Sequence, residues 1–255
     1  MKRFLLAHSE IVCRKVQPSP VVLNTKRDVS FSSFHLLFIA ITFFSSIVTY
    51  AQQDNEQQKA DYKKVIAGRA AKIVHTLEIT DSGKYQKVLA EISNQYFALN
   101  DIQEQAKATA ETIKTQSLSK DQATVSLKNQ DEEKLLQLKQ LHSSFITHLK
   151  ENLTEAQLEK IKDGMTYSVL PITYAAYLDM LPNLTAEQKD QIYTWLKEAR
   201  ELAMDAESSD KKHAVFGKYK GRINNYLSAA GFDMKKEGEE WQKRIKEREA
   251  AKKGN

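Results

Sequence analysis

Residues 85–99 read YQKVLAEISNQYFAL, and their large apolar side chains recur at intervals of four and three: Tyr85, Leu89, Ile92, Tyr96 and Leu99. Side chains at these intervals share one face of an α-helix. The spacing continues at Ala106, Ala110 and Ile113, which predicts a long helix with an apolar seam of the kind found in helical hairpins. Residues 80–83, Thr-Asp-Ser-Gly, supply capping residues just before this helix.

Two neighbouring segments have the same helical period. Their apolar positions are Tyr62, Ile66, Ala70, Ile73 and Leu77 in the first, and Leu135, Leu138, Leu141, Phe145 and Leu149 in the second. Alternating runs of β-branched residues bounded by turns, which are typical of strands, are nearly absent. The sequence therefore predicts an all-α protein, in which a long antiparallel helical hairpin is followed by a compact helical half.

Three expected helix starts share the pattern Leu-Ser/Thr-x-x-Gln, with Ser119, Thr154 and Thr185 at the polar cap position. The hydroxyl of the cap residue can accept from the backbone three residues on, and the Gln side chain can reach back to the cap. The similar spacing of the three boxes also fits a degenerate helical repeat, which we keep as an alternative to three independent caps.

An apolar stretch at residues 34–51 follows Lys26 and Arg27 and ends in Thr49-Tyr50-Ala51. This layout is typical of a cleavable secretory signal. We expect residues 1–51 to be a signal peptide with a possible N-terminal extension, cut after Ala51, and the product to be periplasmic or secreted without a stable membrane span. An uncleaved anchor or a helix of the fold is the alternative.

The basic balance of the chain comes mostly from this N-terminal stretch. Removing residues 1–51 takes away six Lys or Arg and two Asp or Glu, which lowers the formal charge from +5 to +1. A nearly neutral chain argues against nucleic acid as a partner, because such binding needs a clustered excess of cations. The single cysteine, Cys13, lies in the same stretch, so a disulfide scaffold is excluded.

Composition changes at about Leu153, after which aromatic residues become frequent and Pro171 and Pro182 occur. We expect residues 52–152 to form the long hairpin region and residues 153–234 a compact helical half of the same domain. Lys and Glu dominate residues 235–255, which we expect to be a charged C-terminal helix or tail.

Two blocks of the C-terminal half resemble a known family. They are KDGMTY at residues 162–167 continued by PITYAAYLDMLPNLT at 171–185, and HAVFGKYKGRINNYLSAAG at 213–231. They look like the domain of unknown function numbered 3826, found in Bacteroidetes-type bacteria. The resemblance implies an all-helical exported domain in organisms that harvest polysaccharides, and it supplies no catalytic residues. The Leu-Ser/Thr-x-x-Gln boxes also resemble those of periplasmic stress chaperones.

Motifs for catalysis are missing from the sequence: it has no His-Glu-x-x-His, no Gly-x-Ser-x-Gly and no phosphate loop. His142 and His148 are six residues apart and so lie on different faces of a helix, which disfavours a shared metal. We therefore expect no metal and no cofactor, and an enzymatic role is left open but disfavoured.

One polar and aromatic cluster stands out as a candidate ligand site. Its members are Tyr167, Tyr174, Tyr177, Asp179, Lys218, Tyr219, Arg222 and Asn225. Aromatic rings beside directional hydrogen-bonding groups suit a polar ligand such as a sugar. An ordinary core stripe, with Asp179 and Arg222 as an ion pair, is the competing interpretation. In both cases we expect the blocks around Tyr174 and Arg222 to meet, and Asp179 to pair with Arg222.

The leading functional hypothesis is a non-enzymatic binding module for a polar ligand or partner, in glycan utilisation. A carbohydrate-active enzyme and a holdase-like periplasmic chaperone are the two alternatives. The sequence leaves the ligand and the oligomeric state open.

Overall fold

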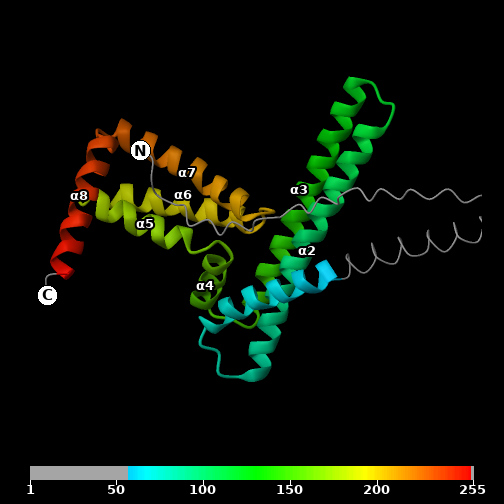
Figure 1. Cartoon of the computed structure of the whole chain (residues 1–255), viewed down its shortest axis with the longest axis horizontal. Helices are drawn as coiled ribbons and strands as arrows, with labels where there is room; N and C mark the ends of the chain where they lie inside the picture. The colour runs from blue at the N-terminus through cyan, green and yellow to red at the C-terminus, as the bar shows by residue number, and fades with distance from the viewer. Residues whose placement is uncertain (1–56, 254–255) are drawn as a thin grey trace, which may run out of the picture. The chain divides into compact units, whose positions relative to one another are not determined.

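The computed structural model describes residues 57–253, and the expected signal peptide with its cut after Ala51 lies outside the described residues. After a first helix at residues 57–75, the chain forms seven more: α2 (Ser82–Thr115), α3 (Lys120–Lys150), α4 (Glu155–Met165), α5 (Val169–Met180), α6 (Ala186–Met204), α7 (Ser209–Ala229) and α8 (Met234–Lys253). The described part contains no strand (Figure 1). The predicted all-α class is confirmed.

The helix starts follow the capping rules that the sequence suggested. Ser119, Thr154 and Thr185 each accept from the backbone N–H three residues on, and the Gln at that position accepts from the cap N–H in return. A reciprocal cap satisfies two backbone N–H groups that a helix start leaves unpaired. The boundaries of α3, α4 and α6 are therefore set by local chemistry.

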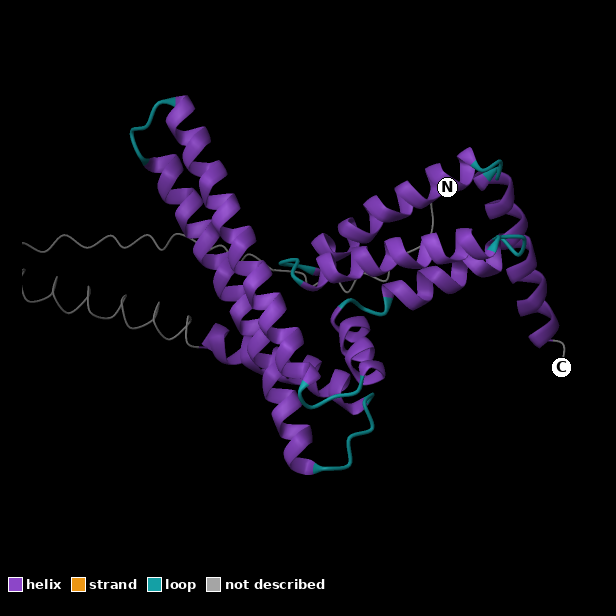
Figure 2. Cartoon of the chain, turned by 180° about the vertical axis from the view of Figure 1, so that it is seen from behind, coloured by secondary structure: helices purple, strands orange, loops and turns teal. Residues whose placement is uncertain are grey.

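Two apolar clusters make up the core. The first joins the helix at residues 57–75 to α2, α3 and α4, and also takes in Met204 at the end of α6. The second lies among α5, α6 and α7, which run side by side in Figure 2. α4 contributes Leu158, Ile161 and Met165 to the first cluster, so apart from Met204 the first cluster ends along the chain at Met165 and the second begins at Leu170.

Helices α2 and α3 pack along each other for most of their length (Figures 1 and 2). Only the part that starts α2 and ends α3 is covered by other helices, with Ile92 and Phe145 buried there. The far part is a two-helix arm, on which the α3 side chains Val125, Leu135 and Leu136 are exposed.

A buried guanidinium ties α4 to α6. The side chain of Arg200, only 1% exposed, donates from Nη1 to Asp163 Oδ1 at 2.7 Å and from Nη2 to Glu159 Oε2 at 2.6 Å. Both acceptors lie on α4. Charge-assisted bonds of this length are the strong ones, and removing one partner leaves the other charge desolvated without compensation.

A second set of ionic contacts joins α3 to the same place. His142 on α3 lies 3.3 Å from Glu201 and 3.0 Å from Asp205, at the end of α6. Hydrogen bonds that the ring donates to Asp205 and then to Glu201 raise the pKa of His142 to about 9, against the opposing effect of burial. Burial works to raise the pKa of Glu201, but hydrogen bonds from His142 and Lys162 outweigh it and lower the value to about 2. Both groups are therefore charged at neutral pH.

Gly164 offers a test of how closely α4 approaches the first helix. A Cβ at this position would lie 2.8 Å from Cγ1 of buried Ile73. Because Ile is stiff at χ1, we expect Gly164→Ala to lower the free energy of unfolding by about 1–2 kcal/mol, measured by urea denaturation. Gly217→Ala is the control: its Cβ meets nothing within 4 Å, so the helix-propensity gain of about 0.5–1 kcal/mol should appear as added stability. Equal stability of the two variants would contradict the close approach.

The raised pKa of His142 predicts a defined pH dependence. The protonated ring stabilises the folded state; the contribution is complete below the unfolded pKa of about 6.5 and is lost as the pH rises toward 9. We expect the stability difference between the wild type and His142→Gln to fall by about 2–3 kcal/mol between these limits, as measured by denaturant titration at each pH. A difference that stays constant from pH 6 to pH 9.5 would show that the ring gains nothing from Asp205 and Glu201.

Candidate functional site

A pocket of about 560 Å³ opens where the first helix, α2, α3 and the segments around Tyr167 and Ser208 come together. This volume is in the range of small-molecule sites.

 

The walls combine a small apolar floor with aromatic and charged side chains. Ile66 and Leu99 are buried and form the apolar part. Ala106, Ala110 and Ala206 also line the pocket, and the other lining residues are polar, aromatic or charged: Tyr62, Arg69, Tyr96, Asn100, Gln103, Glu104, Lys107, Gln130, Asp131, Lys134, Tyr167, Glu207, Ser208, Ser209 and Lys212. An apolar floor with many hydrogen-bonding groups suits a polar ligand that has a ring or a hydrocarbon face.

Tyr62 and Tyr96 lie together on one side of the pocket. The Tyr62 hydroxyl donates to the backbone carbonyl of Tyr96 at 3.5 Å, and its ring lies 6.0 Å from that of Phe97. Burial, followed by the nearby Tyr167, raises the pKa of Tyr96 to about 12. This phenol is therefore neutral at physiological pH and can both donate and accept a hydrogen bond.

Tyr167 enters the pocket from a strained turn between α4 and α5. Tyr167 and Ser168 both have positive φ, 58° and 55°, in the left-handed region that side chains other than glycine rarely adopt. The turn is held by the carbonyl of Asp163, which accepts from the N–H groups of Thr166 at 3.0 Å and Ser168 at 2.7 Å. The Tyr167 ring is 45% exposed and stacks on His213, with centroids 5.6 Å apart and planes 16° apart.

Lys212 closes another side of the pocket as a buried cation. Its side chain is only 6% exposed, and its ammonium donates to the carbonyls of Ala203 at 2.7 Å and Met204 at 2.8 Å. These carbonyls end α6, where a cation also complements the helix dipole. Burial lowers the pKa of Lys212 to about 8, so the ammonium is still mostly protonated at neutral pH.

Of the eight residues in the sequence-predicted cluster, Tyr167 lines the pocket and the others lie on α5 and α7. Tyr177 belongs to the second core cluster, and its hydroxyl donates to Asn224 Oδ1 at 2.7 Å, so the two sequence blocks meet there. Tyr174 packs edge-on against Tyr193 of α6. Tyr219 is a partly buried neighbour of the same cluster, whereas Lys218 and Asn225 are exposed.

The expected ion pair between Asp179 and Arg222 was wrong. Asp179 accepts from Trp241 Nε1 at 2.6 Å and from both terminal nitrogens of Arg248, at 2.9 and 2.6 Å. Hydrogen bonds from Arg248 and then Trp241 lower the pKa of Asp179 to about 2. Arg222 instead lies over the Trp195 ring, 4.3 Å from its centroid, and 3.6 Å from Glu198. The physical reason is that α8 packs back on α5 and supplies the cations.

The pocket residues other than Tyr167 were missed at the level of sequence. Tyr62 and Tyr96 occupy apolar positions of the helical pattern, so the sequence assigned them to the core and gave no role to their hydroxyls. A usable signal was present: Tyr62, Ile66 and Arg69 share one face of the first helix, and Tyr96, Asn100, Gln103 and Lys107 follow the same intervals on α2. Two polar stripes of this kind on adjacent helices indicate a hydrated surface between them.

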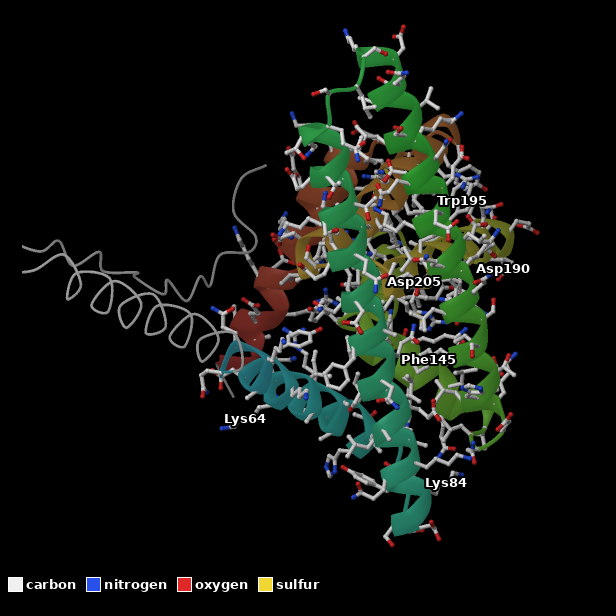
Figure 3. All side chains as sticks on the ribbon, turned by 90° about the vertical axis from the view of Figure 1, so that its right-hand side faces the viewer. Lys64, Lys84, Phe145, Asp190, Trp195 and Asp205 are labelled. Atoms are coloured by element: carbon white, nitrogen blue, oxygen red, sulfur yellow. The ribbon has the colours of Figure 1, made fainter. Side chains whose placement is uncertain are left out.

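Residues 57–253 show neither a metal-binding cluster nor a membrane-spanning helix. In this range no group of three or more His, Cys, Asp or Glu side chains is arranged to hold a metal ion. No described helix is long and apolar enough to cross a membrane. Figure 3 shows the many polar side chains that cover these helices.

Comparison with known proteins identifies a family for this chain. A search of curated proteins finds no match. A family model described as "Protein of unknown function (DUF3826)" matches residues 63–247, which include the pocket residues Arg69, Tyr96, Tyr167 and Lys212. Because this match covers most of the chain, the protein belongs to the DUF3826 family.

Proposed function

We propose that the protein is a non-enzymatic binding module whose polar ligand occupies the pocket between Tyr62, Tyr96 and Tyr167. The observation that carries the proposal is the pocket itself, with a volume of about 560 Å³ and a lining of three tyrosines among amides and charges. Ligand sites in proteins are typically concave and combine apolar contact with a small number of polar groups, as this pocket does.

A carbohydrate is the ligand class that this lining favours. The C–H face of a sugar ring packs on an aromatic ring, and its hydroxyls need donors and acceptors in fixed directions. Tyr167 offers a half-exposed ring whose position is fixed by the stack on His213. Asn100 and Gln103 offer amides that both donate and accept.

The proposed setting is glycan utilisation outside the cytoplasm. The apolar stretch at residues 34–51, with small residues before the expected cut after Ala51, supports export to the periplasm or medium. The resemblance to a family from polysaccharide-harvesting bacteria supports a glycan as the ligand that an exported protein would meet there.

An enzyme is the second candidate, because Glu104, Asp131 and Glu207 also line the pocket. Two carboxylates flanking a bound sugar are what most glycoside hydrolases need. Product analysis of a bound oligosaccharide separates the candidates: release of shorter sugars would establish hydrolysis, and recovery of the intact ligand supports binding alone. A holdase would use instead the exposed apolar side chains of the α2–α3 arm and would bind unfolded proteins there.

Tyr167→Asn tests the binding role directly. Asn removes the ring but tolerates the left-handed backbone, so the fold should persist. We expect the affinity for the best ligand of an oligosaccharide array, measured by calorimetry, to fall by roughly tenfold, as expected for one stacked ring.

Tyr193→Ala is the matched control, since it also removes an exposed ring but lies on α6 in contact with Tyr174. Its affinity should equal that of the wild type. Loss of binding in Tyr193→Ala with full binding in Tyr167→Asn would move the site to the α5–α7 surface. An array on which nothing binds would refute the proposed function.

A further inference from the structure

Two cations face the pocket without a carboxylate partner. Arg69, on the first helix, and Lys212, on α7, both line it. Within residues 57–253 neither side chain has a carboxylate oxygen at ion-pair distance, and the ammonium of Lys212 donates to two backbone carbonyls. Burial is the main cause of the lowered pKa of Lys212; the charge of Asp205 opposes it and the charge of Arg69 adds to it, so Arg69 lies within electrostatic reach of Lys212.

The hydrogen-bonding capacity of these cations is incompletely used. An ammonium group has three N–H donors, and Lys212 spends two of them on Ala203 and Met204. Its third donor has no protein acceptor among the described residues, although the side chain is 94% buried. A buried cation with a spare donor is costly unless a polar group or a negative charge meets it.

The opposite part of the lining is electrically balanced. Lys134 lies 3.7 Å from Asp131 on the same helix, and Lys107 and Glu104 follow each other on α2. Arg69 and Lys212 therefore bring positive charge to the pocket beside Tyr96, whose hydroxyl can donate to the same group. Asp205 offsets part of the charge of Lys212, and Glu207 is the remaining carboxylate of the lining.

We propose that the ligand of this pocket carries an anionic group, a carboxylate or a sulfate ester, and that Arg69 and Lys212 bind it. This inference rests on the proposed carbohydrate-binding function and names its substrate class: acidic sugars, such as uronic acids or sulfated sugars. Arg69 can bind a planar carboxylate or a tetrahedral ester through two parallel N–H groups, while Lys212 adds a point charge.

The test uses matched ligands that differ only in charge. Glucose-, galactose- and mannose-based disaccharides are each offered as the neutral sugar, as the C6 carboxylate and as the 6-sulfate, and affinities are measured by calorimetry. We expect an acidic member to bind at least tenfold more tightly than its neutral counterpart, in line with a charge-assisted hydrogen bond. Raising the ionic strength should lower the affinity for the acidic ligand and leave the affinity for the neutral ligand unchanged.

Arg69→Gln should reduce the affinity for the acidic ligand to that of the neutral one. Because the Arg69 side chain is exposed, we expect the Arg69→Gln variant to keep the melting temperature of the wild type, which serves as the check on folding. Lys64→Gln is the matched control, because Lys64 is an exposed cation on the same helix, outside the pocket lining, and extends from the helix surface in Figure 3. It should retain the full preference for the acidic ligand.

The outcomes separate this inference from the function on which it rests. If neutral and acidic sugars bind equally and Tyr167→Asn weakens both, the carbohydrate site stands and the anionic preference is overturned. If the preference survives Arg69→Gln, the anion binds elsewhere and the inference is overturned. If no member of the set binds, both the function and the inference fall. Comparison of carboxylate and sulfate then assigns the anion.

Discussion

The guanidinium of Arg200, buried between Asp163 and Glu159, is the contact on which the arrangement of the two cores depends. It fixes α4, which belongs to the first core, against α6, which runs through the second. The backbone of Asp163 then holds the turn at Thr166–Ser168. Asp163 thus links the packing of the two cores, through its side chain, to the left-handed conformation that presents Tyr167 to the pocket, through its carbonyl.

The surrounding ionic contacts place the other walls of the pocket. Glu201 follows Arg200 on α6 and contacts Lys162 of α4 and His142 of α3, and Asp205, labelled in Figure 3, contacts His142 as well. The connection from α6 to α7, which lines the pocket, starts at this point. A pocket whose walls are fixed by charged contacts before a ligand arrives loses less conformational entropy on binding.

The helical framework could be predicted from sequence because its determinants are local. Apolar intervals of four and three fix the helices, and Ser119, Thr154 and Thr185 fix three of their starts. The site depends on contacts between distant segments. Asp179 meets Arg248, 69 residues further on, and no local pattern distinguishes Arg248 from the other cations of a charged helix. Tyr167 could be predicted because it is the aromatic residue that ends the block KDGMTY at residues 162–167, whereas Arg69 is one of many exposed cations.

The position at which a polar ligand binds distinguishes the pocket at Tyr167 from the surface formed by α5, α6 and α7. Chemical-shift mapping of the isotope-labelled protein during titration with its best oligosaccharide reports this directly, residue by residue. Binding at the proposed pocket predicts saturable shifts of the amide signals of Tyr62, Tyr96, Tyr167 and Lys212, with little change at Tyr174 and Trp195. Shifts confined to Tyr174, Trp195 and Arg222, with none around Tyr167, would contradict the central claim and place the ligand on the surface formed by α5, α6 and α7.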